Sequence, residues 1–126
     1  MRVLIFGDSI TQGFWGSEGG WANRLRKAYD QKNIEAGNYD QPTIFNLGIS
    51  GDTSKEILQR VENETKARLW PGQEIVFAFS IGVNDARLDG NKPFSAVEEY
   101  VGRLNKIVEI AKTFSSKIMF VGLTRL

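Results

Sequence analysis

Apolar residues along the chain occur either in short continuous runs or at helical spacing. The continuous runs predict strands at residues 2–6, 43–47, 74–80 and 117–121. Apolar residues three and four positions apart predict amphipathic helices at residues 21–32, 54–70 and 95–114. Strands and helices therefore alternate from end to end. Right-handed crossovers fold such a chain into an α/β protein, a three-layer αβα sandwich around a parallel, flavodoxin-like sheet.

Boundary residues and chain length refine this prediction. Thr53 or Ser54 is expected to cap the helix at 54–70. Ser95 and Glu98 have the spacing of a capping box, and residues 89–93 are expected to form a polar loop. The sequence has 126 residues, of which 41% are hydrophobic and 25% charged, and it shows no repeat or linker. A single domain over residues 1–126 is therefore expected.

Composition narrows the classes of partner. Sixteen basic and fifteen acidic residues nearly cancel, so the charge gives no argument for binding nucleic acid or an anionic membrane. Without cysteine or histidine, the usual zinc ligands are missing, and neither a metal nor another cofactor is expected. No apolar run is long enough for a membrane span, and no signal segment precedes the strand that begins at Arg2. A cytoplasmic location is therefore expected.

Three clusters of glycine and polar residues each follow a predicted strand. They are Gly7-Asp8-Ser9, Gly48 with Ser50-Gly51-Asp52, and Gly82 with Asn84-Asp85. In open parallel sheets, ligands bind at this carboxyl edge. The first cluster places Ser9 at a strand-to-helix turn, where backbone N–H groups can stabilise an oxyanion. The same residue types also make ordinary turns, so a structural role is the alternative for each cluster taken alone.

The segments GDSITQG, NLGISGDT and GVND resemble the GDSL, or SGNH, hydrolases, whose second name stands for Ser, Gly, Asn and His. The resemblance maps the first three onto Ser9, Gly48 and Asn84. Together with right-handed crossovers, it implies the strand order 2-1-3-4, numbered along the chain. It implies an esterase or lipase that acts on a small-molecule ester, with Ser9 as nucleophile. The oxyanion hole would be formed by the N–H groups of Ser9 and Gly48 and by the side-chain amide of Asn84.

Neighbouring residues are expected to support this site. Asp8 is expected to hold the oxyanion loops by accepting backbone hydrogen bonds, because a carboxylate with an ordinary pKa is a poor base for a serine hydroxyl. Asp85 is expected to brace the asparagine-bearing turn. Phe14, Trp15 and Trp21 could line an acyl or aryl pocket, but the helical spacing of Trp21 favours ordinary core and lid packing.

The sequence contains no histidine, which is the usual base for a serine nucleophile. In the family, an Asp-x-x-His block after a further element supplies the base and its orienting acid. The chain ends at Leu126, within the loop expected at residues 122–126. We therefore expect the fifth strand and the Asp-x-x-His block to lie beyond the given sequence, and the chain alone to be nearly inactive.

Two interpretations remain open at this point. The first is a serine hydrolase whose catalytic Asp and His lie beyond Leu126. The second is a non-catalytic α/β binding domain or an inactive truncated fragment. Taken alone, the 126 residues would leave the strand at 117–121 as an unpaired apolar edge, and such edges favour pairing with another chain. Either the remaining segment covers this edge in the natural protein, which we favour, or the fragment self-associates through its fourth strand.

Overall fold

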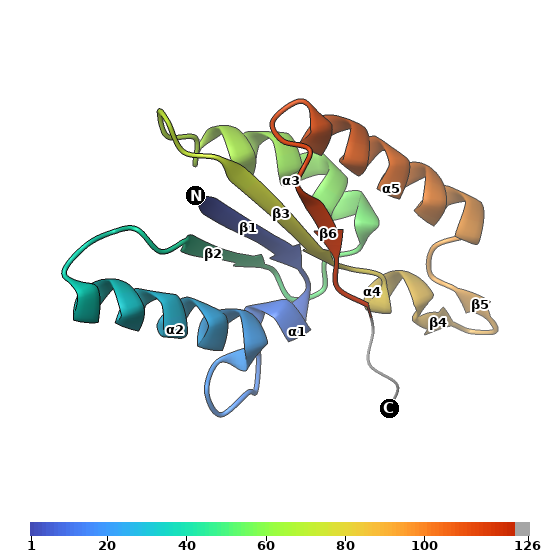
Figure 1. Cartoon of the computed structure of the whole chain (residues 1–126). Helices are drawn as coiled ribbons and strands as arrows, with labels where there is room; N and C mark the ends of the chain where they lie inside the picture. Colours follow the sequence, from blue (N-terminus) through green and yellow to red (C-terminus); the bar gives the residue numbers. More distant parts are fainter. Residues whose placement is uncertain (123–126) are drawn as a thin grey trace.

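The computed structural model describes residues 1–122 and contains a four-stranded parallel sheet (Figure 1). Its strands, in spatial order, are β2 (Thr43–Gly48), β1 (Arg2–Gly7), β3 (Ile75–Ser80) and β6 (Ile118–Phe120). The predicted parallel sheet and the predicted strand order are therefore confirmed. Most of the loop expected at 122–126 lies outside the described residues.

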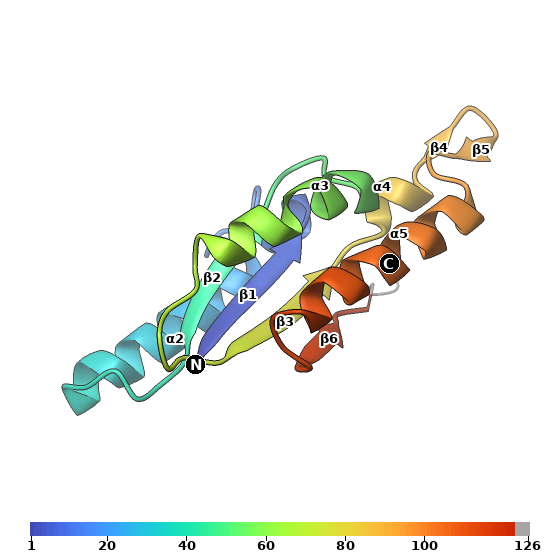
Figure 2. The same cartoon turned by 90° about the horizontal axis from the view of Figure 1, so that it is seen from above.

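Three long helices connect the strands, and two single-turn helices follow strand ends. The long ones are α2 (Gly20–Ala36), α3 (Ser54–Lys66) and α5 (Val97–Lys112), and the short ones are α1 (Ser9–Gln12) and α4 (Val83–Ala86). Helices α3 and α5 cover one face of the sheet and α2 covers the other, which gives the predicted three layers (Figures 1 and 2). Within residues 1–122, no helix has the length and apolar character that crossing a membrane requires.

Alternation of side chains along the strands divides the core into two clusters. Leu4 and Phe6 of β1 join Phe77 and Phe79 of β3 in the larger cluster, to which residues of α3 and α5 also belong. The rings of Phe77 and Phe79 stack with their centroids 5.8 Å apart. Ile5 points to the opposite face, into a smaller cluster with α2. Burying each such side chain contributes about 1.5–3 kcal/mol, so the larger cluster holds the sheet against α3 and α5.

The register of the sheet brings three strand ends to the same level. Gly7, the last residue of β1, pairs with Gly48 at the end of β2 and with Ser80 at the end of β3. The Ile49 N–H continues this pairing by donating to the Gly7 carbonyl at 3.0 Å. The three glycine and polar clusters therefore leave the sheet at one edge.

Helix starts agree with the sequence in one case and differ in another. Thr53 caps α3, and Glu56 completes a capping box by accepting from the Thr53 N–H at 2.9 Å. The predicted capping box at Ser95 is wrong, since Ala96 is the N-cap of α5 and makes no side-chain cap bond. The Ser95 hydroxyl instead donates to Asp85 at 2.8 Å, because a buried carboxylate there outcompetes the helix end.

The other differences concern boundaries and one small hairpin. Helix α2 is longer than predicted, and α3 ends at Lys66 rather than at residue 70. Residues 88–93, which were expected to be mostly loop, contain the antiparallel strands β4 (Leu88–Asp89) and β5 (Lys92–Pro93). Strands of two residues are too short to show an alternating pattern. The signal was Asp89-Gly90, a dipeptide typical of hairpin turns.

Strand β6 forms one border of the sheet. Among the described residues it pairs only with β3, and Met119 and Phe120 are each half exposed. Met119 and Val121 also line an apolar groove of about 230 Å³ that reaches Trp21 and Ala78. This border therefore combines unpaired backbone groups with exposed apolar side chains, which is the combination that favours strand pairing between molecules.

We predict that the 126-residue chain self-associates through β6 and that Met119→Lys weakens this association. A lysine on an edge strand must be desolvated when two copies pair, and edge strands use such charges to prevent pairing. Sedimentation velocity over a wide concentration range should show a smaller sedimentation coefficient for the variant at high concentration. Ile34→Lys adds the same charge to an exposed side chain of α2 and should behave as the unmodified chain. Monomeric behaviour of the unmodified chain at every concentration would refute the prediction.

Candidate active site

Ser9 is the first residue of α1 and directly follows the turn at the end of β1. Asp8 caps this helix, and its Oδ1 accepts from the Ile10 N–H at 2.9 Å. Asp8 is only 2% exposed, whereas Ser9 is partly accessible. Within residues 1–122, neither the N–H nor the hydroxyl of Ser9 makes a hydrogen bond with the protein. Asp8 thus fixes the turn that carries Ser9. The hydrogen bond of its side chain is to the start of α1 and not to one of the other loops at this edge.

Gly48 is a point of close packing between β2 and α1. A Cβ atom on Gly48 would lie 2.3 Å from the Gln12 nitrogen and 2.9 Å from the Asp8 carbonyl oxygen. The Gly48 N–H donates to Asn46 Oδ1 at 3.0 Å, and Asn46 Nδ2 donates to the Thr11 carbonyl at 2.9 Å. Because its N–H already has a partner, the geometry argues against the predicted role of Gly48 as an oxyanion donor.

Gly51 is the second glycine of the loop after β2, and it differs from Gly48. It is exposed, its φ is +88°, and a Cβ there would meet no atom within 4 Å. Its N–H donates to no group of residues 1–122. On either side the loop is fixed, since the Ser50 N–H donates to Gln12 Oε1 at 2.7 Å and the Asp52 N–H to the Ile49 carbonyl at 3.1 Å. The loop therefore holds a free N–H donor in a defined position.

Asn84 lies in α4 and contacts the same loop. Its Nδ2 donates to the Asp52 carbonyl at 2.9 Å, which joins the cluster after β3 to the cluster after β2. A side-chain amide carries two N–H donors, so this bond leaves one of them available. Since Ile49 binds the Gly7 carbonyl, hydrogen bonds link all three clusters along the edge of the sheet.

Arg60 of α3 also contacts this edge of the sheet. Its role was not predicted from the sequence. Its Nε donates to Asp52 Oδ2 at 2.8 Å, and its Nη2 donates to the Leu47 carbonyl at 2.7 Å. The guanidinium also lies 5.4 Å from the centre of the Phe6 ring. Burial raises the pKa of the Asp52 carboxyl above its usual value, and the charge of Arg60 opposes this shift. The sequence feature that could have identified Arg60 is its place as a basic residue within the apolar stripe of α3.

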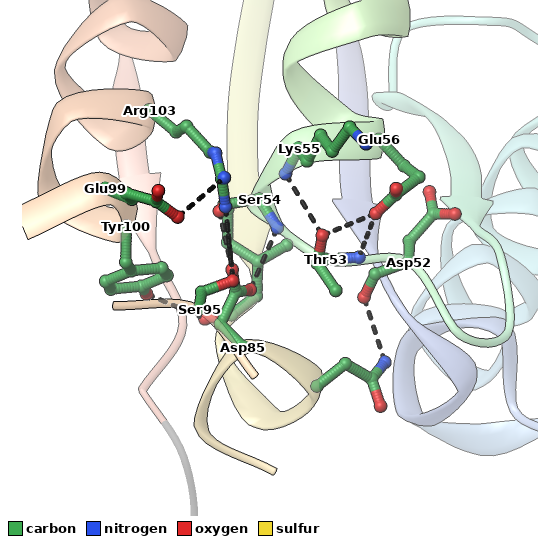
Figure 3. Close-up of polar contacts among 12 residues, drawn as sticks. Asp52, Thr53, Ser54, Lys55, Glu56, Asp85, Ser95, Glu99, Tyr100 and Arg103 are labelled. Carbon is green, nitrogen blue, oxygen red and sulfur yellow. Dashed lines mark hydrogen bonds and ion pairs between the residues drawn. The ribbon is translucent and has the colours of Figure 1, made fainter. Parts of the chain in front are cut away.

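Asp85 of α4 is the centre of a buried polar network (Figure 3). Its Oδ2 accepts from the Ser54 N–H at 2.9 Å, and its Oδ1 accepts from the Ser54 hydroxyl at 2.6 Å. The Ser95 hydroxyl donates to the same Oδ1, and Arg103 Nη1 donates to Ser95 Oγ at 3.1 Å. Asp85 is 3% exposed. It was expected to brace its own turn; the hydrogen bonds of its side chain instead tie α4 to Ser54, the first residue of α3, and to Ser95, just before α5.

A pocket of about 290 Å³ opens beside α4. Its lining comprises Gly82, Asp85, Ala86, Pro93, Ser95, Val97 and Tyr100. The Tyr100 hydroxyl donates to the Ile81 carbonyl at 3.2 Å, and a Cβ on Gly82 would lie 2.8 Å from that hydroxyl. Burial, together with the nearby Asp85 charge, raises the pKa of Tyr100. The pocket is therefore a cavity in which a neutral phenol contacts Ile81 and Gly82, the two residues before α4.

The aromatic residues near Ser9 are divided between surface and core. Trp15 is 94% exposed and Phe14 is 54% exposed, with their rings edge to face at 5.2 Å. Core packing is therefore wrong for both, because they lie in the loop after α1, where helical spacing does not apply, while lid packing stays a prediction. Trp21, within α2, does pack against the smaller core cluster.

Known proteins similar to this chain are esterases and related hydrolases. Residues 5–126 match the model of the GDSL-like Lipase/Acylhydrolase family. The mouse isoamyl acetate-hydrolyzing esterase 1 homolog is 34% identical over 119 residues, which are 89% of this chain and 42% of that protein. The chain therefore spans less than half the length of this relative.

Two solved structures share the fold. The esterase AlinE4, described as a SGNH-hydrolase, is 23% identical with a TM-score of 0.70, over 97% of this chain and 58% of that one. The psychrotrophic esterase EstA from Pseudoalteromonas sp. is 22% identical with a TM-score of 0.72, over 94% and 57% of the two chains. At these identities the likeness establishes the fold alone.

Asp85→Asn is expected to lower the free energy of unfolding by about 2 kcal/mol, because the amide turns one of two acceptor oxygens into a donor that faces buried donors. Urea unfolding at neutral pH measures this change. Asp30→Asn removes the carboxylate of an exposed pair with Arg26 and should cost less than about 0.5 kcal/mol. Equal changes in the two variants would contradict the assigned network.

Proposed function

Because the chain belongs to the GDSL-like lipase/acylhydrolase family, we propose that it carries the nucleophile and the oxyanion hole of a serine esterase. The Ser9 oxygen attacks the carbonyl carbon of a carboxylic ester while a base accepts the hydroxyl proton. The tetrahedral intermediate then expels the alcohol, which takes up that proton, and leaves an acyl group on Ser9. Water releases the acid by the same sequence of steps.

The observation that carries this proposal is a set of unused N–H donors at one edge of the sheet. They are the backbone N–H of Ser9, the backbone N–H of Gly51 and the second amide hydrogen of Asn84. Donors fixed before the reaction stabilise a developing oxyanion, and each contributes about 3 kcal/mol. We place Gly51 in this role in preference to Gly48, whose N–H is bound to Asn46.

The base is the part of the mechanism that these residues do not supply. The sequence has no histidine, so we propose that a base from outside these 126 residues accepts the Ser9 proton. The lengths of the relatives support this, because the chain covers only 58% of AlinE4. The alternative, a domain that binds a ligand without turnover, predicts that no added segment creates Ser9-dependent activity.

The substrate class is proposed from the mouse relative. That protein is named as an isoamyl acetate-hydrolyzing esterase homolog, so we propose a small aliphatic acyl ester as the substrate. No cofactor takes part in the proposed reaction.

We predict that the 126-residue chain hydrolyses p-nitrophenyl acetate only weakly and that a chain extended by its downstream coding sequence is far more active. Ser9→Ala in the extended chain should lower kcat by roughly a thousandfold or more, since the nucleophile is lost. The short chain should retain at most roughly a thousandfold acceleration over water, from its oxyanion donors.

Two results would contradict this proposal. If Ser9→Ala leaves the extended chain fully active, Ser9 is not the nucleophile. If the short and extended chains are equally active and Ser9→Ala abolishes both activities, the base lies within the 126 residues. Asp8 and Asp85 would then be the groups to test, by Asp→Asn substitution at each position.

We predict that Gly51, rather than Gly48, supplies the second oxyanion donor. Diethyl p-nitrophenyl phosphate should phosphorylate Ser9 in the extended chain and place a phosphoryl oxygen in the hole. In ¹H–¹⁵N spectra, hydrogen bonds to this oxygen should move the Ser9 and Gly51 N–H protons and an Asn84 side-chain proton downfield. The Gly48 proton, bound to Asn46, should stay in place. A downfield shift of Gly48 without one of Gly51 would reverse the assignment.

A further inference from the structure

The proposed oxyanion donors rest on a buried ion pair that none of them belongs to. We propose that Arg60 is a positioning residue, which sets the place of the Asn84 amide by holding Asp52. This inference rests on the proposed function, in which Asn84 donates to the oxyanion. It assigns Arg60 no contact with the substrate.

First, Arg60 is anchored by contacts with the sheet and with the loop after β2. Its side chain is 15% exposed, and it lies against the Phe6 ring. Its Nη2 donates to the Leu47 carbonyl, next to the end of β2, while its Nε binds Asp52. One planar group thus connects the fixed end of the sheet to the loop that follows it. A guanidinium is suited to this task, because its donors form a rigid fork.

The second step is the position of Asp52 between two partners. Its carboxylate binds Arg60, and its carbonyl accepts from Asn84 Nδ2 at 2.9 Å. Asp52 also directly follows Gly51. A rotation of Asp52 would therefore displace the hydrogen-bond partner of Asn84, one residue after the proposed second donor.

The third step is the energetic cost of leaving Asp52 unpaired. The Asp52 side chain is 9% exposed, and the charges of Glu56 and Asp8 act on it in the same direction as burial. Removing one member of a buried pair leaves an uncompensated charge, which is far more costly than losing a surface pair. Without Arg60, the carboxylate gains by turning toward water, and this movement would carry the Asp52 carbonyl away from Asn84.

A double-mutant cycle in the extended enzyme tests this connection. The four proteins are the unmodified enzyme, Arg60→Met, Asn84→Ala and the double variant, each assayed with p-nitrophenyl acetate well below its unfolding temperature. Arg60→Met should lower kcat about tenfold with KM changed by less than about twofold, because a donor used in the transition state is misplaced. In the Asn84→Ala background, the same change should lower kcat by less than about twofold, since the group it positions is gone.

Matched variants separate positioning from general stability. Arg26→Met breaks an exposed pair with Asp30 and should leave kcat unchanged. Arg60→Lys keeps a charge beside Asp52 without the fork that also reaches Leu47, so its kcat should lie between those of the unmodified enzyme and Arg60→Met. If Arg60→Met does not fold, Arg60→Lys takes its place in the cycle.

The possible outcomes decide the two proposals separately. Equal effects of Arg60→Met with and without Asn84, or no effect on kcat, would overturn the positioning role and leave the esterase proposal intact. If no activity depends on Ser9, the esterase proposal fails. The Asn84 side-chain amide signals in ¹H–¹⁵N spectra then test positioning directly: a shift in Arg60→Met but not in Arg26→Met supports it, and unchanged signals overturn it.

Discussion

The site depends on three parallel strands that end at the same level. Gly7 pairs with Gly48 on one side and with Ser80 on the other, so the chain leaves the sheet three times along a single edge. This alignment needs a very close approach of backbones, because a Cβ at Gly48 would overlap the α1 backbone near Gln12. The residue that the family resemblance assigned to chemistry is thus required first by packing. Its N–H serves that packing too, through Asn46.

Buried acidic side chains hold the loops of this edge in place. Asp52 joins the loop after β2 to Arg60, and Asp85 joins α4 to the first residues of α3 and to the segment before α5. Asp85 accepts three hydrogen bonds and Asp52 is paired with Arg60, and such partners are the condition under which a buried charge can be tolerated. The consequence is a set of loops fixed by side chains rather than by the sheet itself. Donors carried by such loops need little rearrangement when an oxyanion forms.

The sequence was sufficient for those parts of the molecule that depend on local periodicity. The runs at β1 and β3 and the stripe of α3 predicted the layers, and the strand order followed from right-handed crossovers together with the family resemblance. Long-range contacts were not predictable in this way. Nothing near Ser95 in the sequence indicates that its hydroxyl binds Asp85 rather than the helix end. The choice between Gly48 and Gly51 likewise depends on the Asn46 side chain and on the backbone of α1, which only the folded chain brings together.

The same contacts bear on the question of the base. Asp8 accepts from the Ile10 N–H, Asp52 is paired with Arg60, and Asp85 accepts three hydrogen bonds from two serines. A carboxylate that accepts the Ser9 proton would have to weaken bonds that hold the site together. Each of these three carboxylates is thus already engaged in hydrogen bonds or an ion pair that fix the loops at this edge. A carboxylate that is held by such bonds is poorly placed to accept a proton and return it during the reaction. This supports the proposal that the Ser9 proton is transferred to a base from outside these residues.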